Sequence, residues 1–153
     1  MKAKIIGKRL KKSGKTLSIA ESCTGGLLGH LITSVPGSSD YFVGGIIAYK
    51  DRIKVSQLRV SKAALKKNGA VSESTARSMA RNVRRIFKTN YGLAITGIAG
   101  PNGGNKEKPV GLVYIAVSNS KKVLCKKYRF RGSRSHVKSR SAQAALKLLS
   151  SFL

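Results

Sequence analysis

A chain of 153 residues with 41% hydrophobic content is long enough for a substantial core, and we expect a single domain over residues 1–153. Its 31 lysines and arginines against 5 acidic residues give a formal charge of +26, which favours attraction to polyanions. Five dispersed carboxylates argue against paired-carboxylate catalysis and against an oxygen-rich metal site.

Helical and strand patterns alternate along the chain. Apolar residues at helical spacing predict an amphipathic helix over 2–13, and a short apolar run over 16–20 predicts the first strand. Ser72 as an N-cap, followed by an apolar stripe, predicts a helix over 72–87. The other expected helices are 26–34, 50–58, 61–68 and 133–152, and the other expected strands are 43–49, 91–96 and the hairpin 112–118 with 123–130.

This alternation predicts an α/β fold, with a mixed, mostly parallel sheet of about five strands covered on both faces. The strand over 43–49 is expected to be a buried one. Ligands of such sheets bind at the carboxyl ends of the strands. Three segments rich in glycine or hydroxyl groups follow strands, namely 20–26, the residues after Tyr49, and 97–104. We therefore expect these segments to meet at one edge of the sheet.

The stretch 18–28 combines a strand end, a turn with hydroxyl and thiol groups, and two glycines that open a helix. Such a turn can hold an anion and present a nucleophile. Abundant hydroxyl groups and lysines favour serine chemistry with a lysine base, and Cys23 is the alternative nucleophile.

The two cysteines and two histidines show no spacing typical of a metal site or a disulfide framework. We therefore expect no metal and no cofactor, and a reducing cytoplasm is the simplest compartment. Neither a secretory leader nor an apolar run of membrane-spanning length is apparent, so no membrane association is expected.

Six stretches occur in register from about residue 5 to the end, and together they resemble the CinA C-terminal family, the nicotinamide-nucleotide amidohydrolases. The resemblance implies a three-layer α/β/α sandwich like that of anticodon-binding domains. It also implies hydrolysis of nicotinamide mononucleotide to nicotinate mononucleotide and ammonia, within pyridine-nucleotide salvage. The stretches are 20–26 (Ala-Glu-Ser-Cys-Thr-Gly-Gly), 36–39 with 41–42, Tyr49 with Lys54, 69–72, 96–101 and 108–111.

The resemblance also assigns roles to single residues. Ser22 matches the nucleophile and Lys54 its base. Two roles stay open for Tyr49, a hydrogen bond between these two residues or packing alone. Cys23 is expected to pack in the core. Burial and nearby positive charge can lower the pKa of a lysine enough for it to accept a serine proton. Attack on the carboxamide forms a tetrahedral intermediate with a negatively charged oxygen, the oxyanion. The backbone N–H groups expected to stabilise it are those of Cys23, Thr24, Gly25 and Gly26.

The 5′-phosphate of this substrate needs donors of its own. Polar and backbone contacts to the substrate are expected from Thr24, Thr96, Gly97, Gly100, Gly103 and Gly104. Positive charge is expected from Arg134, Lys138 and Arg140. Lys138 stands where arginine is commoner in the family, and a lysine holds phosphate only as a point charge.

Two other hypotheses remain beside the amidohydrolase. The charge of +26 and the competence association of the CinA name favour a non-catalytic nucleic-acid or partner-binding module, although the basic residues are spread over the whole chain and form no single stripe. A family member that keeps the pocket without activity is the third possibility. Enzymes of this type are often dimers, so a homo-oligomer is expected.

Overall fold

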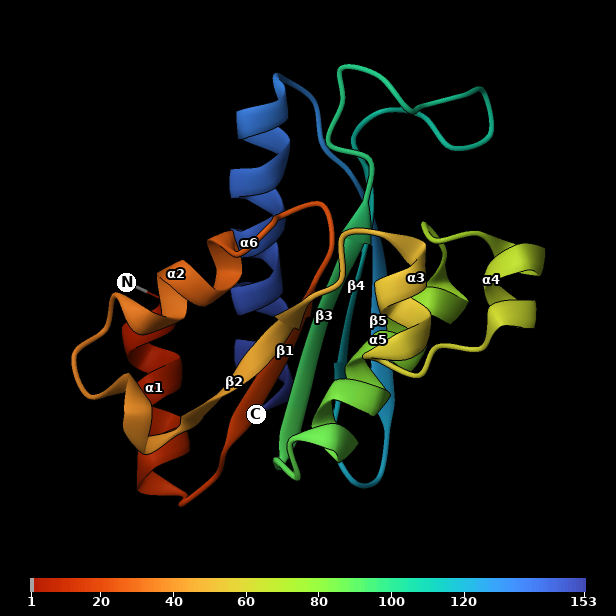
Figure 1. The fold of residues 1–153 in the computed structure, drawn as a ribbon. Coiled ribbons are helices and arrows are strands. Elements are labelled where there is room, and N and C mark those ends of the chain that lie inside the picture. Colours follow the sequence, from red (N-terminus) through yellow and green to blue (C-terminus); the bar gives the residue numbers. More distant parts are fainter. Residues whose placement is uncertain (1) are drawn as a thin grey trace.

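The computed structural model of the protein describes residues 2–153 and shows one five-stranded sheet between two layers of helices (Figure 1). The strand order is β2-β1-β3-β4-β5. β1 pairs in parallel with β2 and β3, whereas β4 is antiparallel to both of its neighbours. The strands are β1 (Leu17–Glu21), β2 (Phe42–Ile47), β3 (Tyr91–Gly97), β4 (Leu112–Ser118) and β5 (Val123–Arg129).

Each face of the sheet is covered by its own group of helices. α1 (Lys2–Lys12), α2 (Leu27–Thr33) and α6 (Arg134–Phe152) bury large aliphatic side chains against one face. α3 (Asp51–Ser56), α4 (Lys62–Asn68) and α5 (Glu73–Ile86) cover the other, and the 3-10 turn η1 (Ser38–Asp40) precedes β2. The predicted three-layer α/β/α architecture is therefore confirmed.

The face beneath α5 carries small residues because this helix packs very close to the sheet. Ala20, Ala94 and Ala116 lie side by side in register on three neighbouring strands and are fully buried. At the start of β3, a Cβ on Gly92 would clash with the Ala80 carbonyl oxygen of α5. A larger side chain in this row would push α5 away from the sheet.

The predicted helices and strands all form, with shifts of a few residues at their ends. Ser72 caps α5 as expected, because its hydroxyl accepts a hydrogen bond from the Thr75 N–H at 3.1 Å. The expectation that 43–49 is a buried strand is wrong. The strand ends at Ile47 and lies at the edge of the sheet. Every second residue of the strand is exposed, and Val43 and Ile47 are both more than half exposed.

No helix in the described part of the chain is long and apolar enough to cross a lipid bilayer.

Candidate functional site

The three predicted segments meet at the carboxyl edge of the parallel strands, where they line one pocket of about 270 Å³. This meeting follows from topology, since β1, β2 and β3 run in the same direction and end at the same edge. The loop 69–72, which precedes α5, closes a further side. The lining residues are Ser22, Cys23, Tyr49, Asp51, Lys54, Ala70, Val71, Thr96, Gly97, Ile98, Ala99, Gly100, Asn102, Gly103 and Arg134.

Ser22 directly follows β1 and presents its hydroxyl to this pocket. Its N–H donates to the Ile95 carbonyl at 3.1 Å, which extends the β1–β3 pairing by one residue, and its own carbonyl accepts from the Gly25 N–H at 3.1 Å. Its side chain is 8% exposed, and Oγ has no hydrogen-bond partner among residues 2–153. The backbone of Ser22 is thus fixed while its hydroxyl stays free to react.

The anion at the N-terminus of α2 comes from the protein itself. The carboxylate of Glu21 accepts hydrogen bonds from the N–H groups of Gly26, Leu28 and Gly29 at 3.1, 3.1 and 2.9 Å. The expected oxyanion cradle is therefore wrong for Gly25 and Gly26, because both N–H groups already have acceptors. Cys23 and Thr24 are the members of that set whose N–H groups donate to no oxygen within residues 2–153.

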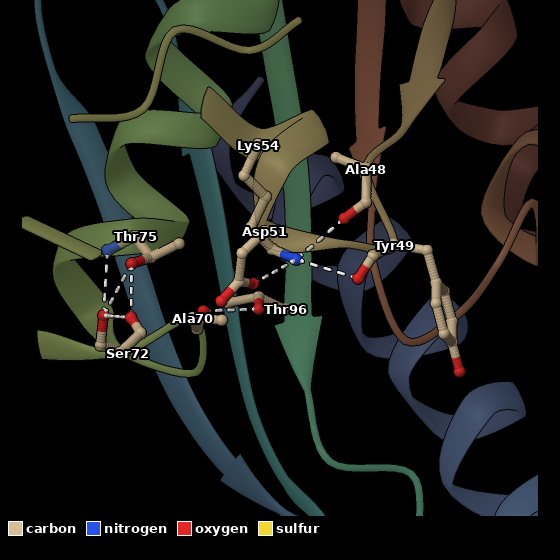
Figure 2. A network of polar contacts seen from close by, with 9 residues as sticks. Ala48, Tyr49, Asp51, Lys54, Ala70, Ser72, Thr75 and Thr96 are labelled. Atoms are coloured by element: carbon tan, nitrogen blue, oxygen red, sulfur yellow. Dashed lines mark hydrogen bonds and ion pairs between the residues drawn. The ribbon is translucent and has the colours of Figure 1, made fainter. Parts of the chain in front are cut away.

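Lys54 is buried although its amine is ionisable, and its side chain is only 1% exposed. Its Nζ donates to the carbonyls of Ala48 at 2.9 Å and Tyr49 at 3.3 Å, and lies 3.6 Å from Asp51 Oδ1 (Figure 2). Burial lowers the pKa of Lys54, and the Asp51 carboxylate partly opposes this by favouring the charged form. Burial therefore makes the neutral, basic form of the amine easier to reach than it is in water.

Nζ forms no hydrogen bond with Ser22 Oγ in the described residues, although both groups line the pocket. The two N–H groups of a neutral amine are sufficient for the two carbonyls, which leaves its lone pair free to accept a proton. Catalytic hydrogen bonds are often long without substrate and tighten when it binds.

Tyr49 does not lie between Ser22 and Lys54, as the first of its two roles requires. Its ring points away from Lys54 in Figure 2, and the side chain is 53% exposed. Its hydroxyl instead accepts a hydrogen bond from Arg134 Nη2 at 2.7 Å, while Arg134 Nη1 donates to the Gly100 carbonyl at 2.7 Å. Arg134 thus links the segment after β2 to the loop after β3 across the mouth of the pocket.

A second link holds the far wall of the pocket. Thr96, at the end of β3, donates its hydroxyl hydrogen to the Ala70 carbonyl at 2.7 Å (Figure 2). This bond joins the strand end to the loop before α5, where Ser72 and Thr75 also bond to each other and to the Gly69 carbonyl. Thr96 has a fully buried side chain, so its contribution to the pocket is to hold this wall in place.

Cys23 is a poor candidate for the nucleophile. Burial, with a smaller contribution from the Glu21 charge, raises the pKa of its thiol to about 11, and burial raises that of Cys125 to about 11 as well. The reactive thiolate is therefore scarce at neutral pH.

We expect Cys23 and Cys125 to react with iodoacetamide at pH 7.5 at least about tenfold more slowly than free cysteine, since alkylation requires the thiolate. Intact mass spectrometry over time measures this rate. Guanidinium-unfolded protein is the control, and both thiols should alkylate rapidly there. Fast labelling of Cys23 in the folded protein would restore it as a nucleophile.

Several residues expected at the site lie outside the pocket. Thr24 is fully buried, and Gly104 packs against the backbone of Val110. Lys138 has its Nζ 3.9 Å from a Cβ built on Gly25, beside the turn rather than in the pocket. Arg140 stands two residues after Lys138, a rotation of about 200° around α6. It therefore lies on nearly the opposite side of the helix from Lys138, where it is exposed. Six of the expected residues do not line the pocket: Thr24, Gly25, Gly26, Gly104, Lys138 and Arg140.

Other lining residues were missed by sequence reasoning. Asp51 could have been predicted from the sequence, since it is one of five acidic residues and stands three positions before Lys54, on the same side of a helix. Ala70 and Val71 lie within a recognised stretch but carry no reactive group. The remaining missed residues lie between the glycines of the 97–104 loop: Ile98, Ala99 and Asn102.

Within residues 2–153, no group of three or more His, Cys, Asp or Glu side chains could hold a metal ion.

Known proteins resemble this chain over its whole length. A family model described as the CinA C-terminal domain matches residues 1–153. A putative competence-damage inducible protein of Desulforudis audaxviator is 45% identical over 150 residues, which cover 98% of this chain and 36% of that protein. A CinA-like protein of a Nostoc species is 48% identical over 158 residues, 96% of this chain and 37% of that protein. The chain therefore spans little more than a third of the length of these curated relatives.

Solved structures of similar size share the fold. The crystal structure of a competence-damaged protein (CinA) superfamily protein from Escherichia coli matches with a TM-score of 0.96 and 29% identity, and the match covers 99% of this chain and 88% of that one. A competence/damage inducible protein from Agrobacterium tumefaciens matches with a TM-score of 0.92 and 34% identity, over 99% of this chain and 95% of that one. The chain belongs to the CinA C-terminal domain family.

Proposed function

We propose that this pocket hydrolyses the carboxamide of nicotinamide mononucleotide, with Ser22 as nucleophile and Lys54 as base. The observation that carries the proposal is a lysine buried to 1% exposure, with a lowered pKa, that lines the same pocket as a free serine hydroxyl. Burying a lysine is costly, because its ammonium is removed from water, and lysines with perturbed pKa values cluster at functional sites. The substrate itself is proposed from the family resemblance.

The reaction proceeds in two halves. Ser22 Oγ attacks the carboxamide carbon as Lys54 Nζ takes the hydroxyl proton, and the tetrahedral intermediate collapses as Lys54 returns that proton to the departing ammonia. Water then attacks the ester carbon of the acyl-enzyme as Lys54 Nζ takes one of its protons, and Lys54 returns that proton to the departing Ser22 Oγ. The carboxylic acid formed loses its remaining proton to the released ammonia, which leaves carboxylate and ammonium. The net change adds one water and releases one ammonia.

The N–H group of Cys23 is the proposed oxyanion donor, since it lies next to Ser22 in the pocket lining and donates to no oxygen among residues 2–153. One such donor typically contributes about 3 kcal/mol to transition-state stabilisation. Arg134 is the proposed phosphate contact, because its guanidinium lies at the pocket mouth and can exchange its bonds to Tyr49 and Gly100 for phosphate oxygens.

Replacing Asp51 by asparagine should move the acidic limb of the kcat/KM pH profile to lower pH. The carboxylate raises the pKa of Lys54, so its loss lowers that pKa further and keeps the base neutral in more acidic solution. The control is Asp40→Asn, which removes an exposed carboxylate paired with Lys11 far from the pocket. An acidic limb that stays in place or moves to higher pH in Asp51→Asn contradicts the assignment of Lys54 as base.

A non-catalytic polyanion-binding role is the second candidate, and one observation favours it. Of the five carboxylates, Glu21 is buried, and Asp40, Asp51 and Glu73 each lie within 4 Å of a lysine or arginine nitrogen, so little negative charge is left to offset the basic surface. This candidate predicts tight, steeply salt-dependent DNA binding that Ser22→Ala leaves intact. Fluorescence anisotropy with labelled DNA at about 0.15 M salt tests it, and absence of binding there removes it.

An ammonia-release assay with nicotinamide mononucleotide tests the proposed hydrolysis directly. Ammonia should appear with wild-type protein and not with Ser22→Ala. Undiminished release by that variant would reject the Ser/Lys assignment.

A further inference from the structure

Glu21 is a buried carboxylate that is not paired with a cation. It is 1% exposed, and no lysine, arginine or histidine nitrogen lies within 4 Å of it among residues 2–153. Buried carboxylates without a cation are rare because desolvation penalises the charge. Here three N–H groups and the positive end of the α2 backbone dipoles supply the compensation.

These three bonds fix the turn that carries Ser22. They tie the last residue of β1 to the first turn of α2, and the Ser22–Ile95 and Ser22–Gly25 bonds hold the residues between them. Ser22 Oγ has no hydrogen-bond partner and the Cys23 N–H donates to no oxygen among residues 2–153, and both residues line the pocket.

We infer that Glu21 is a positioning residue, an internal anion whose three hydrogen bonds hold Ser22 and the Cys23 N–H in reactive geometry. This inference rests on the proposed function. Glu21 touches no reacting atom, because its oxygens face the N–H groups of α2. Its effect on the reaction is therefore expected in kcat more than in KM.

The first test is Glu21→Gln, which preserves size but has a single acceptor oxygen and places an NH₂ group against N–H donors. We expect kcat to fall about 10- to 100-fold with KM changed less than about threefold, as a misplaced nucleophile does. The matched control, Asp40→Asn, makes the same chemical change at an exposed site and should retain wild-type kcat. Unchanged kcat in Glu21→Gln overturns the inference.

The second test restores the missing anion. Glu21→Ala vacates a space facing three N–H groups, and sodium formate should raise the melting temperature of this variant and its kcat by at least about tenfold. Sodium chloride at equal ionic strength should do neither, and formate should leave wild type and Asp40→Asn unaffected. Failure of formate to act on a folded Glu21→Ala overturns the inference, and Glu21→Gln decides it if Glu21→Ala does not fold.

A readout independent of nicotinamide mononucleotide separates this inference from the proposed function. The rate at which a fluorophosphonate modifies Ser22, followed by intact mass, should fall in Glu21→Gln and recover in Glu21→Ala with formate. Normal labelling in Glu21→Gln overturns the positioning role. A wild-type protein that labels at Ser22 but releases no ammonia rejects the substrate and leaves the role of Glu21 supported.

Discussion

Ser22→Ala is expected to lower kcat for nicotinamide mononucleotide hydrolysis by at least about 10⁴-fold, as removal of a catalytic serine does in other acyl-transfer enzymes. The acyl-enzyme cannot form without Oγ, and the neighbouring thiol of Cys23 cannot replace it because its pKa is raised to about 11. Steady-state ammonia release, coupled to a dehydrogenase that consumes ammonia, measures the change.

The substitution should leave the fold intact. Ser22 Oγ has no hydrogen-bond partner among residues 2–153, so its loss should change the free energy of unfolding by less than about 0.5 kcal/mol. Ser120→Ala is the matched control, since this serine lies exposed in the β4–β5 turn away from the pocket. A loss of activity explained by unfolding, or a loss of equal size in Ser120→Ala, would remove Ser22 from the mechanism.

Lys54→Met should lower kcat by about 10²- to 10⁴-fold, the usual contribution of a general base. Methionine retains much of the volume of the side chain and removes its proton acceptor. Lys54→Arg should be similarly inactive, because guanidinium keeps the positive charge but stays protonated at all relevant pH values. Full activity in Lys54→Arg would show that the charge of Lys54, and not its basicity, serves the reaction.

Two measurements support the interpretation of the Lys54 variants. The double variant Ser22→Ala with Lys54→Met should be no slower than Ser22→Ala alone, because the effects of residues that act as one unit are strongly non-additive.

Burial also puts the folded-state pKa of Lys54 below its unfolded value of 10.5. Between these two pKa values the unfolded chain binds the extra proton, so Lys54 makes wild-type stability rise with pH there, and Lys54→Met should lack this contribution.

Much of the fold could be predicted because its signals are local. Ser72 is a capping residue that needs no knowledge of its neighbours, and the apolar stripe that follows predicts α5. The meeting of Ser22 and Lys54 could also be predicted, since carboxyl ends of parallel strands share an edge. The edge position of β2 could not be predicted, because residues 43–47 have the apolar composition of a buried strand. Only the order in which the strands pair shows that one edge of β2 has no neighbouring strand.

The parts of the site that escaped prediction depend on contacts between distant residues or on hydrogen-bond direction. The bond between Tyr49 and Arg134 joins residues 85 positions apart, and no spacing rule predicts it. Glu21 stands beside Ser22 in the sequence, yet its role depends on which N–H groups its oxygens face. Sequence reasoning identified an anion at this turn but attributed it to a ligand, whereas the protein supplies its own.

The most direct test of the central claim is the stoichiometry of products from nicotinamide mononucleotide, with ammonia and nicotinate mononucleotide quantified together by enzymatic assay and chromatography. Wild-type protein should release the two in equal amounts, while Ser22→Ala, folded by thermal melting, should release neither above background and folded Lys54→Met should release both at no more than about 1% of the wild-type rate. Wild-type protein that forms neither product, or a folded Ser22→Ala variant that forms both at the wild-type rate, would contradict the proposed Ser22–Lys54 amidohydrolase.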